Sequence, residues 1–349
     1  VPDFKDSNGS SRVAGNVVFN SSTLKNGGDE HGHGTHVAGI VGGNSWWSGS
    51  SSLQGKYVGI APQANLINVK VSDDEGMSYI SDVVNAIDWV VTNRQAYNIR
   101  VMNLSLISSV AESYRTSVLA GAVERAWFNG IFVVVSAGNN GANTMLYPPA
   151  NDPFVVTVGA ADPMGTTARA DDGMAPWSSY GVSQDGVAKP DVVAPGRYVV
   201  SRLASSYSTL GRTFPDRIVD GTYLRLSGTS MAAPVVAGIA ALAFQAHPEW
   251  TNDQVKWLLT QTAAKLGNGA VPGQGAGLVD ARAVVTYAGT PQAANQGLTI
   301  CELLIGPDGA VNYATSSWST SSWSTSSWST SSWSTSSWST SSWSTVAGD

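Results

Sequence analysis

The stretch Ile131-Phe132-Val133-Val134-Val135 is an almost unbroken apolar run, and Ser136-Ala137-Gly138-Asn139-Asn140-Gly141 follows it at once. A short run of this kind is typical of a strand that is covered on both faces, as the strands of parallel sheets are. The small polar residues after it predict a turn at the strand's carboxyl end. We therefore expect residues 131–135 to form an inner strand of a parallel sheet.

The pattern continues on both sides of this strand. Short β-branched runs predict strands over residues 65–71, 100–104 and 154–158, and segments of helical period predict helices over residues 79–97, 111–129, 229–247 and 252–262. Alternation of strands and helices implies an α/β fold with three αβα layers and a mainly parallel sheet. We expect this domain to cover residues 1–288.

Composition narrows the class of protein further. Of 349 residues, 42% are hydrophobic and 13% are charged, with a net charge of -6, which supports a folded core and argues against a disordered chain. No basic block is present, so nucleic acid is not expected as a partner. No apolar run reaches about 18 residues, so we expect no membrane span. The lone cysteine, Cys301, excludes a disulfide within the chain and is interpreted as a partly buried thiol.

Both ends of the chain depart from this pattern. Val1-Pro2-Asp3-Phe4 does not resemble a signal peptide and leads into a polar loop, so we expect a processed or truncated chain. Residues 289–315 predict a short C-terminal extension, and residues 316–345 repeat Ser-Ser-Trp-Ser-Thr. One interpretation of the repeat is an extended low-complexity tail. The other is adhesion, with regularly spaced tryptophans that bind glycan, cell wall or one another.

A histidine-rich motif is the first strong sign of chemistry. It reads His31-Gly32-His33-Gly34-Thr35-His36-Val37-Ala38-Gly39. Histidine is the usual general base for activating a hydroxyl, because its pKa lies near neutral pH. A metal site or a structural histidine cluster is the alternative. The spacing of three between His33 and His36, with no following Glu, does not fit the zinc-peptidase helix pattern.

A serine motif is the second sign. It reads Ser227-Gly228-Thr229-Ser230-Met231-Ala232-Ala233-Pro234, with the expected helix 229–247 beginning inside it. A serine at a helix start is ordinarily an N-cap. However, backbone N–H groups and the helix dipole also favour developing negative charge there. That environment suits the nucleophile of an acyl transfer.

Asn139 supplies a third candidate, just beyond the run 131–135. An asparagine in this position is ordinarily a turn former. Its amide can instead donate a hydrogen bond to an oxyanion. The two interpretations stay open on the residues alone.

Together the three motifs resemble the subtilase family of serine peptidases. The family's His-Gly-Thr-His-Val-Ala-Gly motif matches at His33, its Gly-Thr-Ser-Met-Ala-Ala-Pro motif at Ser230 and its oxyanion asparagine at Asn139. Shorter stretches resemble the family as well, at residues 59–62, 69–71, 158–160 and 189–196. The resemblance covers about residues 1–288. It implies a subtilisin-like αβα fold and an endopeptidase with Ser230 as nucleophile, His33 as general base and Asn139 as oxyanion donor.

The catalytic aspartate of the family has no match in this chain. In subtilases it lies in an Asp-Thr-Gly or Asp-Ser-Gly motif on the first core strand, shortly before a segment that Pro2-Asp3-Phe4 resembles. Asp3 and Asp6 are poor substitutes, and Asp29 matches an acidic position ahead of the histidine motif. We therefore expect the aspartate upstream of Val1. Loss of this aspartate from a triad lowers turnover about 10⁴-fold, so this chain alone is expected to be inactive or strongly impaired.

The resemblance also implies where a peptide substrate binds. Subtilases hold it as an added strand between two flanking segments. These correspond here to Gly76-Met77-Ser78 and Ser105-Leu106-Ile107, with Ser136-Ala137-Gly138 as a wall of the first side-chain pocket. Leu146 corresponds to the floor of that pocket. A leucine there predicts small or medium apolar side chains before the scissile bond.

Partners, cofactors and location follow only from the resemblance. The chemistry requires no cofactor, while structural calcium is common in the family; no ligand for it is assigned, since the Ser/Gly-rich insert 44–55 lacks acids. The family implies an extracellular or cell-surface location. A separate N-terminal fragment or a prodomain is an expected partner. The alternative function is a catalytically impaired subtilase scaffold that acts as a binding or surface protein through its Trp repeats.

Overall fold

Strand β4 runs through the middle of the structure, a computed structural model that describes residues 1–20, 27–46, 51–267, 271–306 and 308–313. The strands are β1 Val13–Val18, β2 Leu66–Lys70, β3 Val101–Leu104, β4 Phe132–Ser136, β5 Val156–Asp162, β6 Gly173–Met174, β7 Gly181–Val182, β8 Ala188–Lys189, β9 Val192–Pro195, β10 Val199–Arg202, β11 Ile218–Val219 and β12 Tyr223–Leu226. The α-helices are α1 His33–Gly42, α2 Ile80–Asn93, α3 Val118–Phe128, α4 Thr209–Thr213, α5 Thr229–Ala246, α6 Asn252–Thr262 and α7 Ala281–Val285.

The main sheet is parallel, as the apolar runs predict. β3, β4, β5 and β9 pair in parallel, and β6 adds a short antiparallel edge to β5. Every residue of β4 is buried, which explains why its sequence shows no polar alternation. The prediction of a mainly parallel α/β sheet is confirmed.

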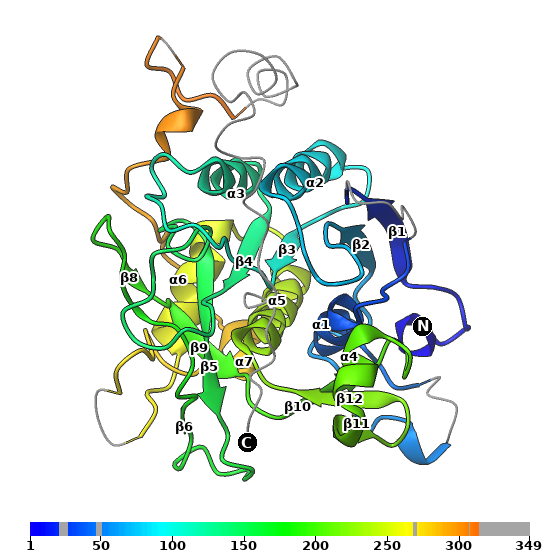
Figure 1. The fold of residues 1–349 in the computed structure, drawn as a ribbon. Coiled ribbons are helices and arrows are strands. Elements are labelled where there is room, and N and C mark those ends of the chain that lie inside the picture. Colours follow the sequence, from blue (N-terminus) through cyan, green and yellow to red (C-terminus); the bar gives the residue numbers. More distant parts are fainter. Residues whose placement is uncertain (21–26, 47–50, 268–270, 307, 314–349) are drawn as a thin grey trace.

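A second parallel pair, β1 and β2, stands apart from this sheet. Val17 of β1 lies opposite Val69 of β2 in the ladder. Among the described residues, β2 pairs only with β1, while β3 pairs only with β4. Figure 1 shows β1 outermost, then β2, then β3. The parallel strands are therefore in two groups, and among the described residues β2 and β3 are both unpaired on the side where the two groups meet.

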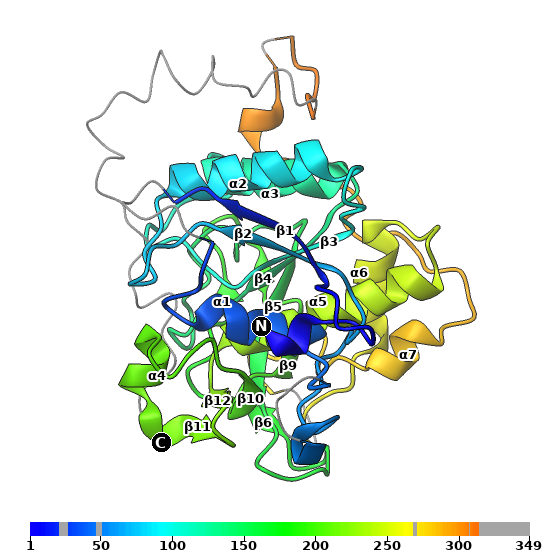
Figure 2. The ribbon, with the colours of Figure 1, turned by 90° about the vertical axis from the view of Figure 1, so that its right-hand side faces the viewer.

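Helices cover both faces of the sheet. Figures 1 and 2 show α2 and α3 side by side on one face, and α5 on the other with α1, α6 and α7 around it. Helix α5 packs against β3, β4, β5 and β9. By length and composition α5 is the one described helix that could cross a membrane, but 78% of it is buried inside the protein. It is the central core helix, which a simple count of apolar run length does not reveal.

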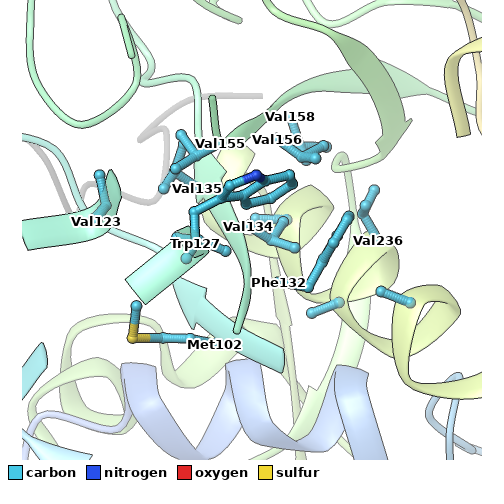
Figure 3. Packing of buried hydrophobic residues seen from close by; sticks show 14 of the residues in the cluster. Met102, Val123, Trp127, Phe132, Val134, Val135, Val155, Val156, Val158 and Val236 are labelled. Atoms are coloured by element: carbon cyan, nitrogen blue, oxygen red, sulfur yellow. The ribbon is translucent and has the colours of Figure 1, made fainter. Parts of the chain in front are cut away.

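Aromatic side chains connect α3, the sheet and α5 within a core that is otherwise rich in valine (Figure 3). The Trp127 ring lies 5.2 Å from that of Phe132, which in turn lies 5.9 Å from Phe244 of α5. Phe132 is fully buried. Burial of each such side chain contributes about 2–3 kcal/mol to stability. The cluster therefore stabilises the position of β4, and with it the start of the loop that follows this strand.

Several expected elements have different bounds; the helix expected at 79–97, for example, covers Ile80–Asn93, and two further differences have an identifiable cause. The helix expected at 111–129 begins at Val118, because the Ser117 hydroxyl accepts a hydrogen bond from Ala120 N–H and caps it. The preceding residues form a loop that Tyr114, which is buried, holds to the core. The strand expected at 154–158 covers Val156–Asp162 instead. A run of Gly and Ala near its end hides the second half of that strand from a search for β-branched residues.

Residues 289–306 and 308–313, called here the C-terminal strap, pack along the domain rather than leaving it. Ala294 N–H of the strap donates to Asp253 O, and Lys256 Nζ donates to Asn295 Oδ1 at 2.9 Å. Further on, Tyr114 Oη donates to Thr299 O at 2.8 Å. The repeat at 316–345 lies outside the described residues.

Cys301 is the most deeply buried residue of the strap. Its N–H donates to Glu124 Oε2 at 2.9 Å and its thiol to Arg115 O at 3.2 Å. Cys301 is fully buried rather than partly buried, and burial raises the pKa of its thiol to about 12. The strap is therefore part of the core packing of α3, and its thiol is unreactive at neutral pH.

Candidate active site

His33 is the first residue of α1, and the preceding loop is built to start that helix. Gly32 has a φ of 98° and lies so close to Ser208 that a Cβ on it would be 2.9 Å from the hydroxyl oxygen. Asp29 accepts hydrogen bonds from Gly32 N–H at 2.8 Å and Thr35 N–H at 2.6 Å. The carboxylate satisfies N–H groups of the first turn and so fixes the direction in which His33 leaves the helix.

His33 is in a form that can accept a proton. Its side chain is buried, and burial together with the neighbouring His31 and His36 lowers the pKa of His33 well below its usual value. The imidazole is therefore neutral at neutral pH. A neutral imidazole is the form that a general base requires.

His36 has a structural position. Its Nε2 lies 2.9 Å from Leu224 O, and burial lowers the pKa of His36 to about 4. His31 lies 6.3 Å from His33 between ring centroids, and burial lowers its pKa as well. Within the described ranges, no group of three or more His, Cys, Asp and Glu side chains is placed to hold a metal ion. The motif thus places two neutral histidines near His33.

Ser230 lies in the first turn of α5, at the carboxyl end of β3. Its Oγ is 3.4 Å from Ser105 O, and Ser105 Oγ donates to Ser230 O at 3.0 Å. These two contacts tie the start of α5 to the stretch that continues β3. Helix α1 packs against α5, so the helices that carry His33 and Ser230 are neighbours.

Asn139 is held in one orientation by Thr229. Its Oδ1 accepts from both Thr229 N–H and Thr229 Oγ1, each at 3.0 Å. Thr229 Oγ1 in turn accepts from Gly138 N–H at 3.1 Å. Because the carbonyl oxygen of the amide is used in this way, the Nδ2 group points away from Thr229.

Gly228 shows where the Asn139 amide points. A Cβ placed on Gly228 would lie 3.6 Å from Asn139 Nδ2 and 3.7 Å from Ser230 N. The two nitrogens therefore surround a single small space that exists because residue 228 has no side chain. Two N–H donors around one space beside a hydroxyl can stabilise an oxyanion.

The acidic residues nearest to the start of the chain have other partners. Asp3 is buried, accepts from Tyr223 Oη at 2.9 Å and pairs with Arg202 at 3.5 Å. Asp6 accepts from Asn8 N–H and Ser10 N–H in an exposed turn. Asp29 caps α1, as described above. Each of these three carboxylates therefore has partners other than His33.

The expected substrate-flanking stretches lie around these residues. Gly76 approaches His31, since a Cβ on Gly76 would be 2.9 Å from His31 Nε2. The neighbouring Met77 and Ser78 are held by Asp73 and Ser72. On the other side, Ser105 contacts Ser230, while Leu106 and Ile107 are buried.

The expected pocket wall continues β4. Ser136 ends that strand, Ala137 N–H donates to Val158 O of β5 at 3.0 Å, and Gly138 N–H reaches Thr229. Leu146 is half-buried, and its carbonyl accepts from Glu112 N–H at 3.2 Å. These contacts hold the Leu146 backbone, so a place for its side chain at the pocket floor stays a prediction.

Two residues of the site escape a reading of the motifs. Thr229 orients Asn139, and Asp29 caps α1. The signal for Thr229 is its place between Gly228 and Ser230. Asp29 lies three residues before Gly32, ahead of the usual capping position, so local spacing does not predict its contacts with the first turn of α1. In both cases the partner atoms come together only in the folded chain.

A comparison with protein families finds one match, to a model described as the subtilase family, over residues 2–277. Among curated proteins, serine protease AprX of Bacillus subtilis is 39% identical over 259 residues, which are 72% of this chain and 57% of that protein. Thermostable alkaline protease of Halalkalibacterium halodurans is 34% identical, over 76% of this chain and 61% of the relative. The chain thus spans less than two thirds of the length of these two relatives.

A shorter relative and a solved structure are also similar. Subtilisin BL of Lederbergia lenta is 35% identical over 73% of this chain and 78% of its own length. The crystal structure of a cold adapted subtilisin-like serine proteinase matches with a TM-score of 0.56 and 29% identity, and covers 77% of this chain and 80% of that one.

Proposed function

Since the chain belongs to the subtilase family and has its subtilisin-like α/β fold, we propose that it is the main part of a serine endopeptidase, with Ser230 as nucleophile and His33 as general base. The observation that supports this proposal best is the pair of nitrogens, Asn139 Nδ2 and Ser230 N, around the space beside Gly228. A binding scaffold has no chemical need for such a pair.

In the proposed reaction Ser230 Oγ attacks the carbonyl carbon of a peptide bond. His33 takes the proton from Oγ as the C–O bond forms, and later gives it to the leaving amine as the C–N bond breaks. Water repeats the sequence on the acyl-enzyme and releases the acid. The lowered pKa of His33 keeps the base unprotonated before the attack.

The charge that develops on the carbonyl oxygen is held by Asn139 Nδ2 and Ser230 N–H. Thr229 keeps the Asn139 amide pointed toward that oxygen before the substrate arrives. An oriented donor requires no reorganisation in the transition state, and removal of one such donor lowers turnover about 10²–10³-fold.

We propose that the third member of the triad is an aspartate on a segment outside this chain. The described acids near the chain's start are engaged with Tyr223, with a turn and with the N-terminus of α1. In addition, β2 and β3 each have one unpaired edge among the described residues. One further parallel strand between these two groups would join them into a continuous sheet and end on the side of His33 and Ser230. A separate N-terminal fragment or an upstream extension is a source for it.

The proposed substrate is a polypeptide in extended form. It lies along residues 105–107 as an added strand, with Gly76-Met77-Ser78 on its other side, so that main-chain hydrogen bonds provide affinity. The reaction uses no cofactor in this scheme. Structural calcium stays a family expectation without assigned ligands, since the described carboxylates do not gather into a site. An extracellular location agrees with bacterial proteases such as subtilisin NAT among the relatives.

Casein hydrolysis tests this proposal. The 349-residue chain is compared with the same chain extended upstream through an Asp-Ser/Thr-Gly strand, and with the extended Ser230→Ala variant. We expect the extended chain to cleave casein, the short chain to cleave about 10⁴-fold more slowly, and the Ser230→Ala variant to lose activity. If the extended chain is folded and does not cleave, the peptidase proposal is wrong. The Trp repeats then become the working part of a surface or binding protein.

A further inference from the structure

Two chain stretches leave the sheet side by side next to Ser230. β3 and β4 are parallel neighbours, with Leu104 opposite Val135 in the last rung. Beyond that rung the first stretch is held by the contact between Ser105 and Ser230. The second turns toward β5 through Ala137 and toward α5 through Gly138. The two stretches therefore diverge beyond that rung, and the region between residues 105–107 and 136–138 is called here the slot.

Ile107 fills that slot. A Cβ built on Gly138 would lie 2.9 Å from Ile107 Cδ1 and 3.1 Å from Ser179 Oγ. Ile107 is 3% exposed although it lies in a loop, and Ser179 is fully buried. The tip of the isoleucine therefore reaches across from one stretch to the backbone of the other.

The position of the oxyanion donors relates this slot to the substrate. The reacting carbonyl oxygen lies between Asn139 Nδ2 and Ser230 N, and Gly138 directly precedes Asn139 in the chain. The substrate residue that carries this carbonyl runs along residues 105–107 as an added strand. Its side chain therefore projects between the two stretches, beside Gly138, where Ile107 stands.

We infer that Ile107 is a specificity-determining residue that restricts the side chain before the scissile bond to glycine, alanine or serine. This inference rests on the proposed peptidase function and sharpens it, because Leu146 alone predicts medium side chains as well. A phenylalanine side chain needs the volume that the four carbons of Ile107 now occupy. The restriction is steric, so a smaller residue at 107 removes it.

The experiment compares two peptide substrates that differ only in Ala or Phe before the scissile bond. Both are given to the extended chain with Ile107, Ile107→Val and Ile107→Ala. We expect the Phe/Ala ratio of kcat/KM to rise about 3-fold in the valine variant and about 10–100-fold in the alanine variant. The readout is the ratio of the two kcat/KM values within each variant, so it does not depend on the absolute rate of that variant.

A matched control separates this effect from loss of packing. Ile87 of α2 is equally buried at 2% exposure and lies in the helical layer, so Ile87→Ala loses the same volume away from the slot. Its Phe/Ala ratio should stay at the parent value. The Ile107→Val variant removes a single methyl group, so it keeps the test valid if the alanine variant fails to fold.

The outcomes are distinct. An unchanged Phe/Ala ratio in an active, folded Ile107→Ala variant overturns the inference and leaves the proposed function intact. A change in that ratio from Leu146→Ala but from neither Ile107 variant assigns the restriction to Leu146. If no variant and no parent cleaves either substrate, the proposed function fails and the inference fails with it.

Discussion

Ionisable side chains are buried both at the start of α1 and beneath the C-terminal strap. Burial shifts their pKa values in opposite directions in the two places. At α1, burial lowers the pKa of His33 and His36. Under the strap, burial and the neighbouring Asp152 raise the pKa of Glu124. In both places a low-dielectric surrounding selects the neutral form, a base without its proton and an acid with it. The stability of one protein can therefore decrease in acid because of the histidines at the start of α1, and decrease in alkali because of the acid beneath the strap.

The direction of each effect follows from linkage. His36 has a pKa of about 4 in the folded state and about 6.5 when unfolded, so its stabilisation is full above pH 6.5 and is lost as pH falls toward 4. Glu124 has a raised pKa in the folded state, so its stabilisation is full below about pH 4.3 and is lost as pH rises from there. Lys189 and Lys256 face Asp152 and favour its charged form, so the proton stays with Glu124.

The largest effect on stability is expected from removal of the strap, which exposes the buried acid beneath it. Truncation before residue 289 leaves the partners of Asn295, Thr299 and Cys301 without these bonds, at about 1–3 kcal/mol each. We expect a loss of about 3–6 kcal/mol in the free energy of unfolding, measured in urea at pH 7. A chain that ends at Tyr313 is the control and should keep the parent value. Equal stability of the two truncated chains would contradict the role given to the strap.

The second prediction concerns the histidine end. His36→Gln keeps a donor for Leu224 O but does not titrate. Between pH 7 and pH 4 the parent should lose about 3 kcal/mol of stability through protonation of unfolded His36. The variant should not show this part of the loss. Urea unfolding across this pH range measures it. His247→Gln, at a partly exposed site, serves as the control, and the same acid dependence in both variants would refute the assignment.

The third prediction concerns the strap end. Glu124→Gln keeps the shape of the protonated acid and an acceptor for Cys301 N–H. We expect its stability to decline less between pH 6 and pH 7.5 than that of the parent, with a difference of about 2 kcal/mol at pH 7.5. Thermal unfolding at both pH values tests this. Glu249→Gln, at a side chain that is 68% exposed, is the control and should decline as the parent does. A parent-like decline in Glu124→Gln would show that Glu124 does not cause the loss of stability in alkali.

The smallest expected effect tests whether the cap of α1 contributes to activity as well as to stability. Asp29→Ala removes the acceptors of Gly32 N–H and Thr35 N–H, and we expect it to cost about 1 kcal/mol of stability. In the extended chain, kcat/KM should also fall about 10-fold, because His33 is displaced. Asp280 caps α7 through Ala283 N–H, so Asp280→Ala should cost similar stability at full activity. Equal activity in both variants would show that the cap does not position His33.

The sequence predicts well the features that are local in the chain. The run 131–135 predicts β4, since five apolar residues in a row suit a strand covered on both faces. The Ala-rich segment predicts α5, whose bounds differ by one residue from those expected. The motifs single out His33, Ser230 and Asn139 because the residues around each of them are contiguous in the sequence, and the catalytic roles of the three stay a prediction.

Features made by distant residues escape prediction. The buried seat of the strap brings together Glu124, Asp152 and Cys301, none of which belongs to a motif. Ile107 is predicted only as part of a substrate-flanking stretch, and its approach to Gly138 appears only in the folded chain. In the same way α3 begins at Val118 only because Ser117 caps it, while Tyr114 anchors the preceding loop. Such features depend on tertiary contacts rather than on local pattern.

The strap has a further consequence for the lifetime of the molecule. In the proposed peptidase, once its triad is complete, other copies of the same chain are the nearest polypeptides at high concentration. A segment is cut only when it can detach and extend along the substrate-binding stretches. Hydrogen bonds at Ala294, Thr299 and Glu302 hold the strap's backbone to the domain. The rate of self-digestion at this end is then set by the free energy of lifting the strap, rather than by the sequence that the strap would present.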